Sequence, residues 1–244
     1  MALRAALACR PGVAYALGGK FYLQPTGKVS GFAWPLMRGP AFAIDEETSG
    51  LARLPADGRK DPSPMEMCEA VERYYSEGVN IVGMGENDTG AAFAGYGEPL
   101  LRLQAVTEAA TLIRERRHGV PLRVVTTGLG DVGDVSDVAS QLAGAGISAA
   151  TVNLLAATPD AFERRVSALS ETYRELLGDD AKDALPVRAG AFGAVCTLVE
   201  ALSEKGIEVE VAMVSGAPDS DVSAGKALAE SLGAVSFRAR SYHK

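Results

Sequence analysis

The sequence predicts an α/β fold built on a parallel sheet. Short apolar or β-branched segments alternate with longer segments whose apolar residues recur at helical spacing, at least five times along the chain. Such alternation predicts parallel strands joined by right-handed helical crossovers. A closed barrel, a partly open barrel and a doubly wound sheet all fit the pattern. No change in composition divides the 244 residues, so one domain is expected over residues 1–244.

Each strand is predicted from a short run of β-branched, aromatic or small apolar residues next to turn residues. The run at 20–24 is aromatic and apolar, the run at 122–127 is β-branched, and the run at 207–214 alternates glutamate with valine. In chain order the expected strands are residues 20–24, 80–84, 91–94, 122–127, 151–155, 207–214 and 235–240.

Each helix is predicted from apolar residues that fall on one face and from residues that favour helix ends. Ser63 and Glu66 form a capping box before the first helix, Asp134 opens another, and Gly233 ends the last. The expected helices are residues 64–78, 100–117, 134–145, 159–177, 190–205 and 222–232. The expected irregular segments are an N-terminal extension at 1–19, an aromatic loop at 25–40, and surface segments at 44–64 and 178–188.

Composition and charge narrow the class of function. The net charge is -7 and the chain has no long basic run, which disfavours nucleic acid as a partner. No apolar run approaches transmembrane length, and the N-terminal stretch lacks the apolar core of a signal peptide. We therefore expect a cytoplasmic protein with a small-molecule substrate and no membrane partner, and a homodimer stays open. Cys9, Cys68 and Cys196 lie too far apart for a local metal motif and are interpreted as free thiols.

The segment Gly95-Tyr96-Gly97-Glu98-Pro99, here the GYGEP turn, lies between an expected strand and an expected helix. Ligands of parallel sheets bind at the carboxyl ends of strands. Two glycines allow close approach to a ligand, and Glu98 would suit a ligand ammonium or hydroxyl group. Equally, Glu98 could simply cap the helix, because acidic residues favour helix N-termini.

Two further patterns have competing interpretations. Residues 128–133 match the G-x-G-x-x-G form of a dinucleotide fingerprint, which would make the protein an NAD-dependent oxidoreductase. However, strands precede the motif, and no acidic residue follows at the spacing that a ribose contact needs.

Arg238 and Arg240 alternate on the last strand, where they would bind a carboxylate or phosphate, or protect a solvated edge strand. His243 is a candidate base, whereas His118 is interpreted as a surface helix cap.

Several segments taken together resemble the radical SAM superfamily, and most closely the TatD-associated radical SAM proteins. They are Phe21-Tyr22-Leu23, Arg38, residues 93–99 with Leu101-Arg102-Leu103, Val124-Val125-Thr126-Thr127-Gly128-Leu129-Gly130, Val152-Asn153-Leu154-Leu155-Ala156-Ala157 and residues 237–243. The resemblance spans roughly residue 20 to the C-terminus and implies a partial (β/α)6 barrel with parallel strands. It also implies that the GYGEP turn holds the methionine amino group of S-adenosylmethionine and that Asn153 lies near the ribose.

One departure from the family alters the expected chemistry. The CxxxCxxC loop that binds the [4Fe–4S] cluster aligns with Val29, Ala33 and Leu36, whose side chains cannot coordinate iron. Phe32 and Trp34 would fill the volume of the cluster. We therefore expect S-adenosylmethionine or a related nucleoside without a cluster or another metal, used for polar chemistry such as alkyl transfer or elimination. The alternative is a non-catalytic pseudoenzyme or regulatory binding protein partnered with an active enzyme.

The candidate residues follow from these interpretations. The catalytic candidates are Tyr96 and His243. The cofactor-binding candidates are Gly95, Tyr96, Gly97, Glu98, Pro99, Thr127, Gly128 and Asn153. The substrate-binding candidates are Arg38, Arg238 and Arg240.

Overall fold

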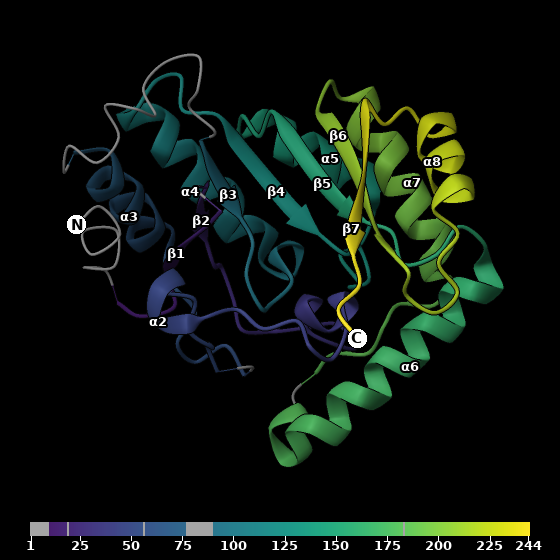
Figure 1. The fold of residues 1–244 in the computed structure, drawn as a ribbon. Coiled ribbons are helices and arrows are strands. Elements are labelled where there is room, and N and C mark those ends of the chain that lie inside the picture. Colours follow the sequence, from purple (N-terminus) through teal and green to yellow (C-terminus); the bar gives the residue numbers. More distant parts are fainter. Residues whose placement is uncertain (1–9, 19, 56, 77–89, 183) are drawn as a thin grey trace.

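The computed structural model describes residues 10–18, 20–55, 57–76, 90–182 and 184–244. In this part of the chain one curled sheet of seven strands forms the centre of the molecule (Figure 1). The strands are β1 (Ala14–Leu17), β2 (Lys20–Leu23), β3 (Ala91–Phe93), β4 (Leu122–Thr126), β5 (Ala149–Asn153), β6 (Glu208–Ser215) and β7 (Ser236–Ser241).

The strands lie side by side in the order in which they occur in the chain. The hairpin strand β1 pairs antiparallel with β2, and every later neighbour, from β2 to β7, pairs in parallel. Sequential order with crossovers of one hand curls the sheet into a half-barrel, which remains open between β1 and β7. A doubly wound sheet would reverse its strand order at a switch point, so that alternative from the sequence is excluded.

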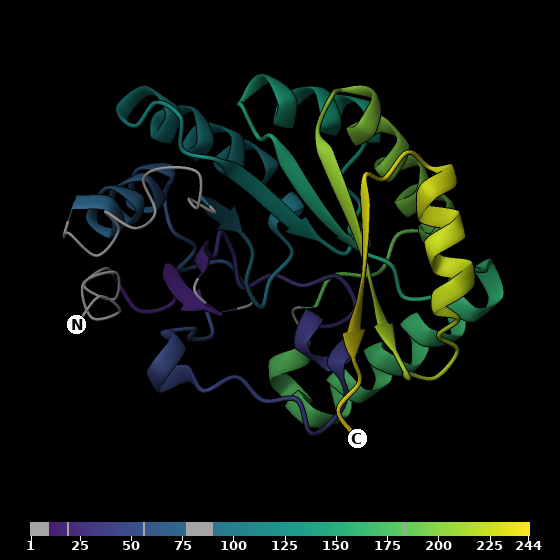
Figure 2. The same ribbon diagram turned by 45° about the horizontal axis from the view of Figure 1, so that its top comes forward.

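Helices cover the convex face of the sheet, and one long helix does not. Figures 1 and 2 show α3, α4, α5, α7 and α8 outside the curl, whereas α6 crosses beyond the carboxyl ends of the strands. These helices are α3 (Pro64–Ser76), α4 (Leu103–Arg116), α5 (Val135–Gly144), α6 (Pro159–Leu177), α7 (Ala191–Glu204) and α8 (Val222–Ser231). The short helical turns are α2 (Glu46–Ser49), η1 (Trp34–Arg38), η2 (Pro99–Arg102) and η3 (Gly178–Ala181).

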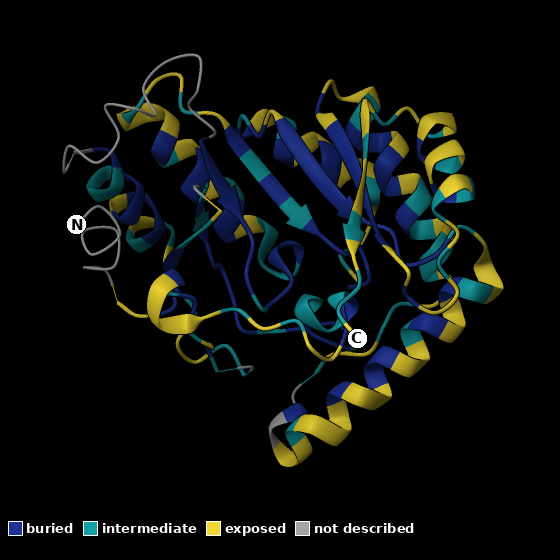
Figure 3. Cartoon of the chain, in the orientation of Figure 1, coloured by how far each residue is buried: buried dark blue, intermediate teal, exposed yellow. Residues whose placement is uncertain are grey.

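The two faces of the sheet differ in chemistry because successive strand residues point to opposite sides. Phe21, Phe93, Val124 and Val152 are fully buried in the hydrophobic core between sheet and helices. Figure 3 shows the central strands as mostly buried and the outer sides of the helices as exposed. The concave face instead carries the alternate residues, many of which are polar.

Most expected elements are confirmed, with small shifts at their ends. The fifth strand lies at Ala149–Asn153 rather than 151–155. Two alanines join its start, and it ends at Asn153, although the amide of Leu154 still donates a hydrogen bond to the carbonyl of Ala212 on β6. The helix expected at 100–117 begins with the 3-10 turn η2. The strand expected at 80–84 and the residue Cys9 lie outside the described residues.

One strand was not predicted, and the short helical turns η1, α2 and η3 fall in segments that were expected to be irregular. Residues 14–17, which the sequence places in an N-terminal extension, form β1 and pair with β2 from Ala14 opposite Leu23 to Leu17 opposite Lys20. The sheet is therefore not purely parallel. The ring of Tyr15 stacks on that of Tyr22 at 4.8 Å between centroids, which fixes the register of this hairpin.

Within the described residues, no helix combines the length and the apolar character that crossing a bilayer requires.

Candidate functional site

A cavity of about 330 Å³ lies at the carboxyl ends of the central strands, and we call it the mouth cavity. Its volume is in the range of small-molecule sites, about 300–1,000 Å³. The candidate residues that line it are Arg38, Gly95, Tyr96, Gly97, Glu98, Pro99, Thr127, Asn153 and Arg240. The candidates Gly128, Arg238 and His243 are not among its lining residues. The fold therefore brings together residues from the GYGEP turn, η1 and the ends of β4, β5 and β7.

The GYGEP turn is held by contacts with the segment that follows β2. The amide of Tyr96 donates a hydrogen bond of 2.7 Å to Oε1 of Gln24, and the amide of Glu98 donates to the carbonyl of Lys28. Gly95 has φ +154°, and a Cβ there would collide with the Gln24 side chain. A Cβ at Gly97 would overlap the carbonyl of Thr26. Both glycines are therefore needed for close backbone approach.

Glu98 is buried, and its carboxylate is fully hydrogen-bonded. Oε1 accepts from the amide of Leu100 at 3.2 Å and from Thr126 Oγ1 at 2.6 Å. Oε2 accepts from both the amide and Oγ1 of Thr127, at 2.8 and 2.7 Å. This carboxylate caps η2 and joins the turn to the end of β4. The geometry thus matches the capping interpretation of Glu98.

The main-chain carbonyls of the turn differ from the Glu98 carboxylate, whose oxygens already accept hydrogen bonds. No described residue donates a hydrogen bond to the carbonyl oxygens of Gly95, Tyr96 or Gly97. Such carbonyls at the edge of a cavity can accept hydrogen bonds from an ammonium group. The turn can therefore bind a cation through its main chain while Glu98 fixes its shape.

Asn153 and Thr127 place polar groups at the ends of β5 and β4. Asn153 is buried, and its Nδ2 donates to the carbonyl of Thr126 at 3.2 Å. This contact orients the amide and leaves its Oδ1 as an acceptor for a hydroxyl group. Thr127 lines the cavity, but its hydroxyl hydrogen bonds to Glu98.

Tyr96 lines the cavity, although its hydroxyl group is engaged with neighbouring residues. The hydroxyl donates to Oε1 of Glu46 at 3.2 Å, and the guanidinium of Arg53 lies 4.6 Å from the ring centroid. Burial, followed by the charge of Glu46, raises the pKa of Tyr96 above its usual value. The phenol therefore keeps its proton at neutral pH and is poorly suited to act as a base.

His243 is not a lining residue of the mouth cavity, and it contacts Arg38 of η1. Its ring nitrogen Nε2 is 3.2 Å from Nη2 of Arg38, and its ring lies 5.2 Å from that of Phe42. Its amide donates to the carbonyl of Arg38, and the Arg38 Nε donates to the carbonyl of Ser241. The contacts between His243 and Arg38 thus hold the chain after β7 against η1.

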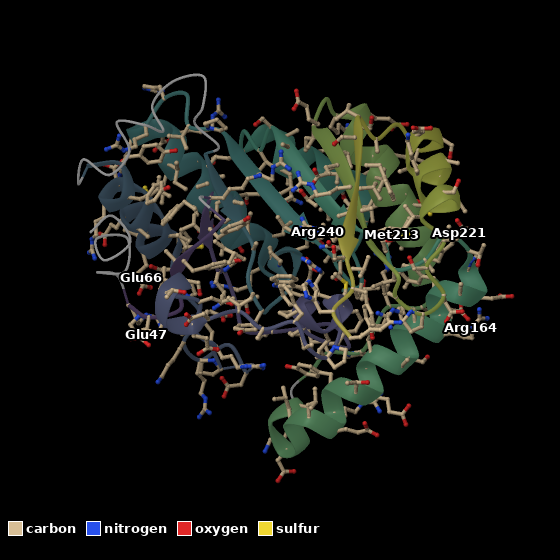
Figure 4. The ribbon with its side chains drawn as sticks, in the orientation of Figure 1. Glu47, Glu66, Arg164, Met213, Asp221 and Arg240 are labelled. Carbon is tan, nitrogen blue, oxygen red and sulfur yellow. The ribbon has the colours of Figure 1, made fainter. Side chains whose placement is uncertain are left out.

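Arg238 and Arg240 lie on the concave face of β7 but in different surroundings. Arg240 lines the mouth cavity, whereas Arg238 forms an ion pair with Glu210 of β6. In Figure 4, Arg240 lies at β7 on the inner side of the curl, while Arg164 and Asp221 lie at the outer rim near α6 and α8.

Close packing explains two of the three glycines in the motif at 128–133, whereas a Cβ at Gly133 would meet nothing within 4 Å. Gly128 has φ +67°, and a Cβ there would contact Val195 and Leu198 of α7. A Cβ at Gly130 would meet Leu101 and Ser30. These glycines therefore bring the loop close to neighbouring elements, and nothing in their geometry favours a dinucleotide.

The positions that align with the cluster cysteines do not fit a [4Fe–4S] cluster. Val29 and Ala33 belong to the hydrophobic core, and Leu36 packs against it. Phe32 and Trp34, which lie between these positions in the sequence, line the mouth cavity. The side chains at these three positions are hydrocarbon and offer no donor atom to iron. Burial raises the pKa of the Cys68 and Cys196 thiols, which suits free, protonated cysteines.

Gln24 is a site residue that the sequence did not reveal. It is fully buried, and its Nε2 donates to the carbonyls of Gly12 and Ala52 while its Oε1 holds the turn at Tyr96. The available signal was its position directly after the strand at 20–23, where site residues of parallel sheets occur.

A larger cavity of about 780 Å³ lies on the other side of Tyr96, between the 52–60 segment and α6. Tyr96 is the one candidate residue among those that line this cavity, so the cavity shares little with the predicted site.

Comparison with protein-family models and with curated protein sequences finds no match for this chain.

Proposed function

We propose that this chain is a half-barrel protein of the radical SAM type that binds S-adenosylmethionine, or a related nucleoside, in the mouth cavity without an iron–sulfur cluster. The observation that carries the proposal is the GYGEP turn, whose residues line a cavity that Asn153 also lines and whose first three carbonyl oxygens accept no hydrogen bond from the described residues. In this arrangement the carbonyls of Gly95, Tyr96 and Gly97 bind the ligand ammonium group. The Asn153 amide binds a ribose hydroxyl, and the rings of Phe32 and Trp34 contact apolar parts of the ligand.

We propose polar alkyl transfer as the activity. A bound sulfonium supplies an electrophilic carbon, and the protein contributes position and exclusion of water. Among the described lining residues, Glu98 is fully hydrogen-bonded and Tyr96 retains its proton. With no free base at the site, the nucleophile is expected to be one that is already ionised at neutral pH. It attacks the sulfonium carbon, and the carbon–sulfur bond electrons remain on the thioether product.

Binding is tested by calorimetry with S-adenosylmethionine. Wild type is expected to bind, and Asn153→Ala is expected to weaken the affinity about tenfold, the usual cost of one hydrogen bond of about 1.4 kcal/mol. Gln104→Ala, which removes an exposed amide on α4, is the matched control and should bind as wild type does. A folded wild-type protein that takes up no ligand at millimolar concentration would overturn the proposal.

The alternative of a non-catalytic binding protein is favoured by one observation, the position of His243 outside the mouth cavity. Mass spectrometry of S-adenosylmethionine incubated with the protein and ionised acceptors such as thiolates separates the two functions. Accumulation of the demethylated thioether with a matching gain of mass on the acceptor supports alkyl transfer. Binding without turnover of any acceptor leaves the binding protein as the function.

A further inference from the structure

A second cavity, here the floor cavity, occupies the concave side of the sheet toward the amino ends of the central strands. Its volume is about 470 Å³. The charged residues that line it are Lys20, Arg123, Glu208, Glu210, Arg238 and Arg240. Four cations thus meet two carboxylates in a protein whose overall charge is -7.

Two of the four cations in this cluster form no ion pair with a described carboxylate. Arg238 Nη2 forms a short contact with Glu210 Oε2. Arg123 Nη1 lies 3.0 Å from Thr151 Oγ1 and 4.0 Å from Glu210 Oε1. Glu210 therefore forms ion pairs with both Arg123 and Arg238. Lys20 and Arg240 have no carboxylate within ion-pair distance among the described residues.

The positions of Lys20 and Arg240 are energetically unfavourable, because burial removes water from a charged group. Lys20 and Arg240 are both partly buried. Burial, followed by the charges of nearby arginines, lowers the pKa of Lys20 and of Arg240. Protection of an edge strand explains charges on β7 but not Lys20 on β2 or Arg123 on β4, which lie inside the sheet. The interior of a parallel barrel is normally filled by apolar side chains, so a cationic floor calls for a counter-charge.

The floor cavity adjoins the mouth cavity, because the two share lining residues. Leu17, Gly18, Tyr22, Val125 and Arg240 line both. Of these shared residues, Leu17 and Val125 are apolar, and Arg240 is charged. A molecule with an anionic end in the floor cavity would therefore extend toward the GYGEP turn.

We propose that the floor cavity binds the dianionic group of a small-molecule substrate, a phosphate monoester or a dicarboxylate, between Lys20 and Arg240. Two unpaired cations match two negative charges, and Arg240 can bind one oxyanion through two N–H groups. The phenol of Tyr22, which lines both cavities, is positioned to donate a further hydrogen bond. The assignment of this molecule as the co-substrate of alkyl transfer depends on the proposed function, whereas anion binding itself does not.

The test is calorimetry with inorganic phosphate, succinate and, as a monoanion, acetate, each with and without S-adenosylmethionine. Phosphate or succinate is expected to bind the wild-type protein alone, more tightly than acetate, and more weakly as salt concentration rises. The tighter of the two dianions identifies the substrate class. Absence of dianion binding, or equal binding of acetate, overturns the proposal even where S-adenosylmethionine binds. Failure of S-adenosylmethionine alone overturns only the function of the mouth cavity.

Variants assign the anion to the floor cavity. Lys20→Gln and Arg240→Gln are each expected to weaken dianion binding about tenfold or more, as loss of a charge-assisted hydrogen bond predicts. Lys226→Gln on α8 and Arg174→Gln on α6 make the same charge changes at exposed positions and are expected to leave the affinity unchanged. Circular dichroism checks that each variant is folded. Equal weakening by all four variants would show general attraction to charge and would overturn the site.

Discussion

Glu98 shows how a single buried side chain can fix the shape of a turn at the edge of a cavity. Its carboxylate accepts hydrogen bonds from Leu100, Thr126 and Thr127, so it ties the GYGEP turn to both β4 and η2. Acidic residues in ligand-binding turns are often interpreted as ligand contacts. Here the same residue type is needed because four donor groups, from three residues, require an acceptor.

Replacement of Glu98 by alanine is expected to lower the free energy of unfolding by at least about 3 kcal/mol, because several buried donors lose their acceptor. Urea unfolding measures this change. Glu171→Ala removes an exposed carboxylate on α6 and is expected to change stability by less than about 0.5 kcal/mol. Similar losses in the two variants would mean that the Glu98 contacts contribute little.

The glycines of the chain differ in what a methyl group would meet. A Cβ at Gly97 would overlap the Thr26 carbonyl and come within 2.7 Å of the Lys28 carbonyl, whereas a Cβ at Gly193 meets nothing within 4 Å. Gly97→Ala is therefore expected to destabilise the protein and to abolish ligand binding. Gly193→Ala is expected to stabilise α7 by about 0.5–1 kcal/mol. Thermal unfolding of both variants tests this, and a neutral Gly97→Ala would contradict the observed backbone approach.

At the scale of elements, helix starts follow local rules closely. Asp134 accepts hydrogen bonds from the amides of Ser136 and Asp137 and caps α5, as its position in the sequence predicts. Asp134→Ala is expected to cost about 1 kcal/mol in urea unfolding. Asp137→Ala removes an acid from the same turn without removing the cap, and a smaller loss of about 0.3 kcal/mol is expected. Equal losses would show that charge, rather than capping, stabilises this end.

Elements that depend on local patterns were predicted better than elements that depend on pairing. The helix at 159–177 has the observed bounds of α6, because its apolar stripe and Pro159 are local signals. β1 was missed since a four-residue strand is stabilised by its partner β2 and by the Tyr15–Tyr22 stack, not by its own composition. The strand at 149–153 begins with two alanines, which carry no β signal.

The candidate site was predicted in its location more than in its contacts. The sequence places the GYGEP turn, Thr127 and Asn153 at strand ends, and parallel strands then bring them to one edge. It does not show that Glu98 is fully hydrogen-bonded or that His243 is held by Arg38, because these contacts join segments distant in the chain. The sequence does not indicate Gln24 either, because its hydrogen bonds join it to Gly12, Ala52 and Tyr96, which are distant in the chain.

At the scale of the whole molecule, alkaline pH is expected to weaken the fold. Burial, followed by the nearby phenols of Tyr22 and Tyr96, raises the pKa of Tyr15 well above 10.0. Above about pH 10 the unfolded chain loses this proton while the folded chain keeps it, so stability is full below that pH and is lost as pH rises. Lys20, whose pKa is lowered in the fold, contributes in the opposite sense.

The measurement is urea unfolding at pH values on either side of pH 10 for wild type and Tyr15→Phe. The phenylalanine ring keeps the stack on Tyr22 but has no proton to lose. Its stability is therefore expected to fall less steeply with pH than that of wild type. Parallel curves for the two proteins would assign the alkaline loss to other groups.

The strands β1 and β7 form the two edges of the half-barrel and do not pair with each other. An open sheet of this kind restricts the size of a bound molecule less than a closed barrel would. A complete cylinder admits only molecules narrow enough to enter through its ends. Between β1 and β7 the sheet itself sets no such limit, so a molecule longer than the half-barrel is wide could extend past this edge.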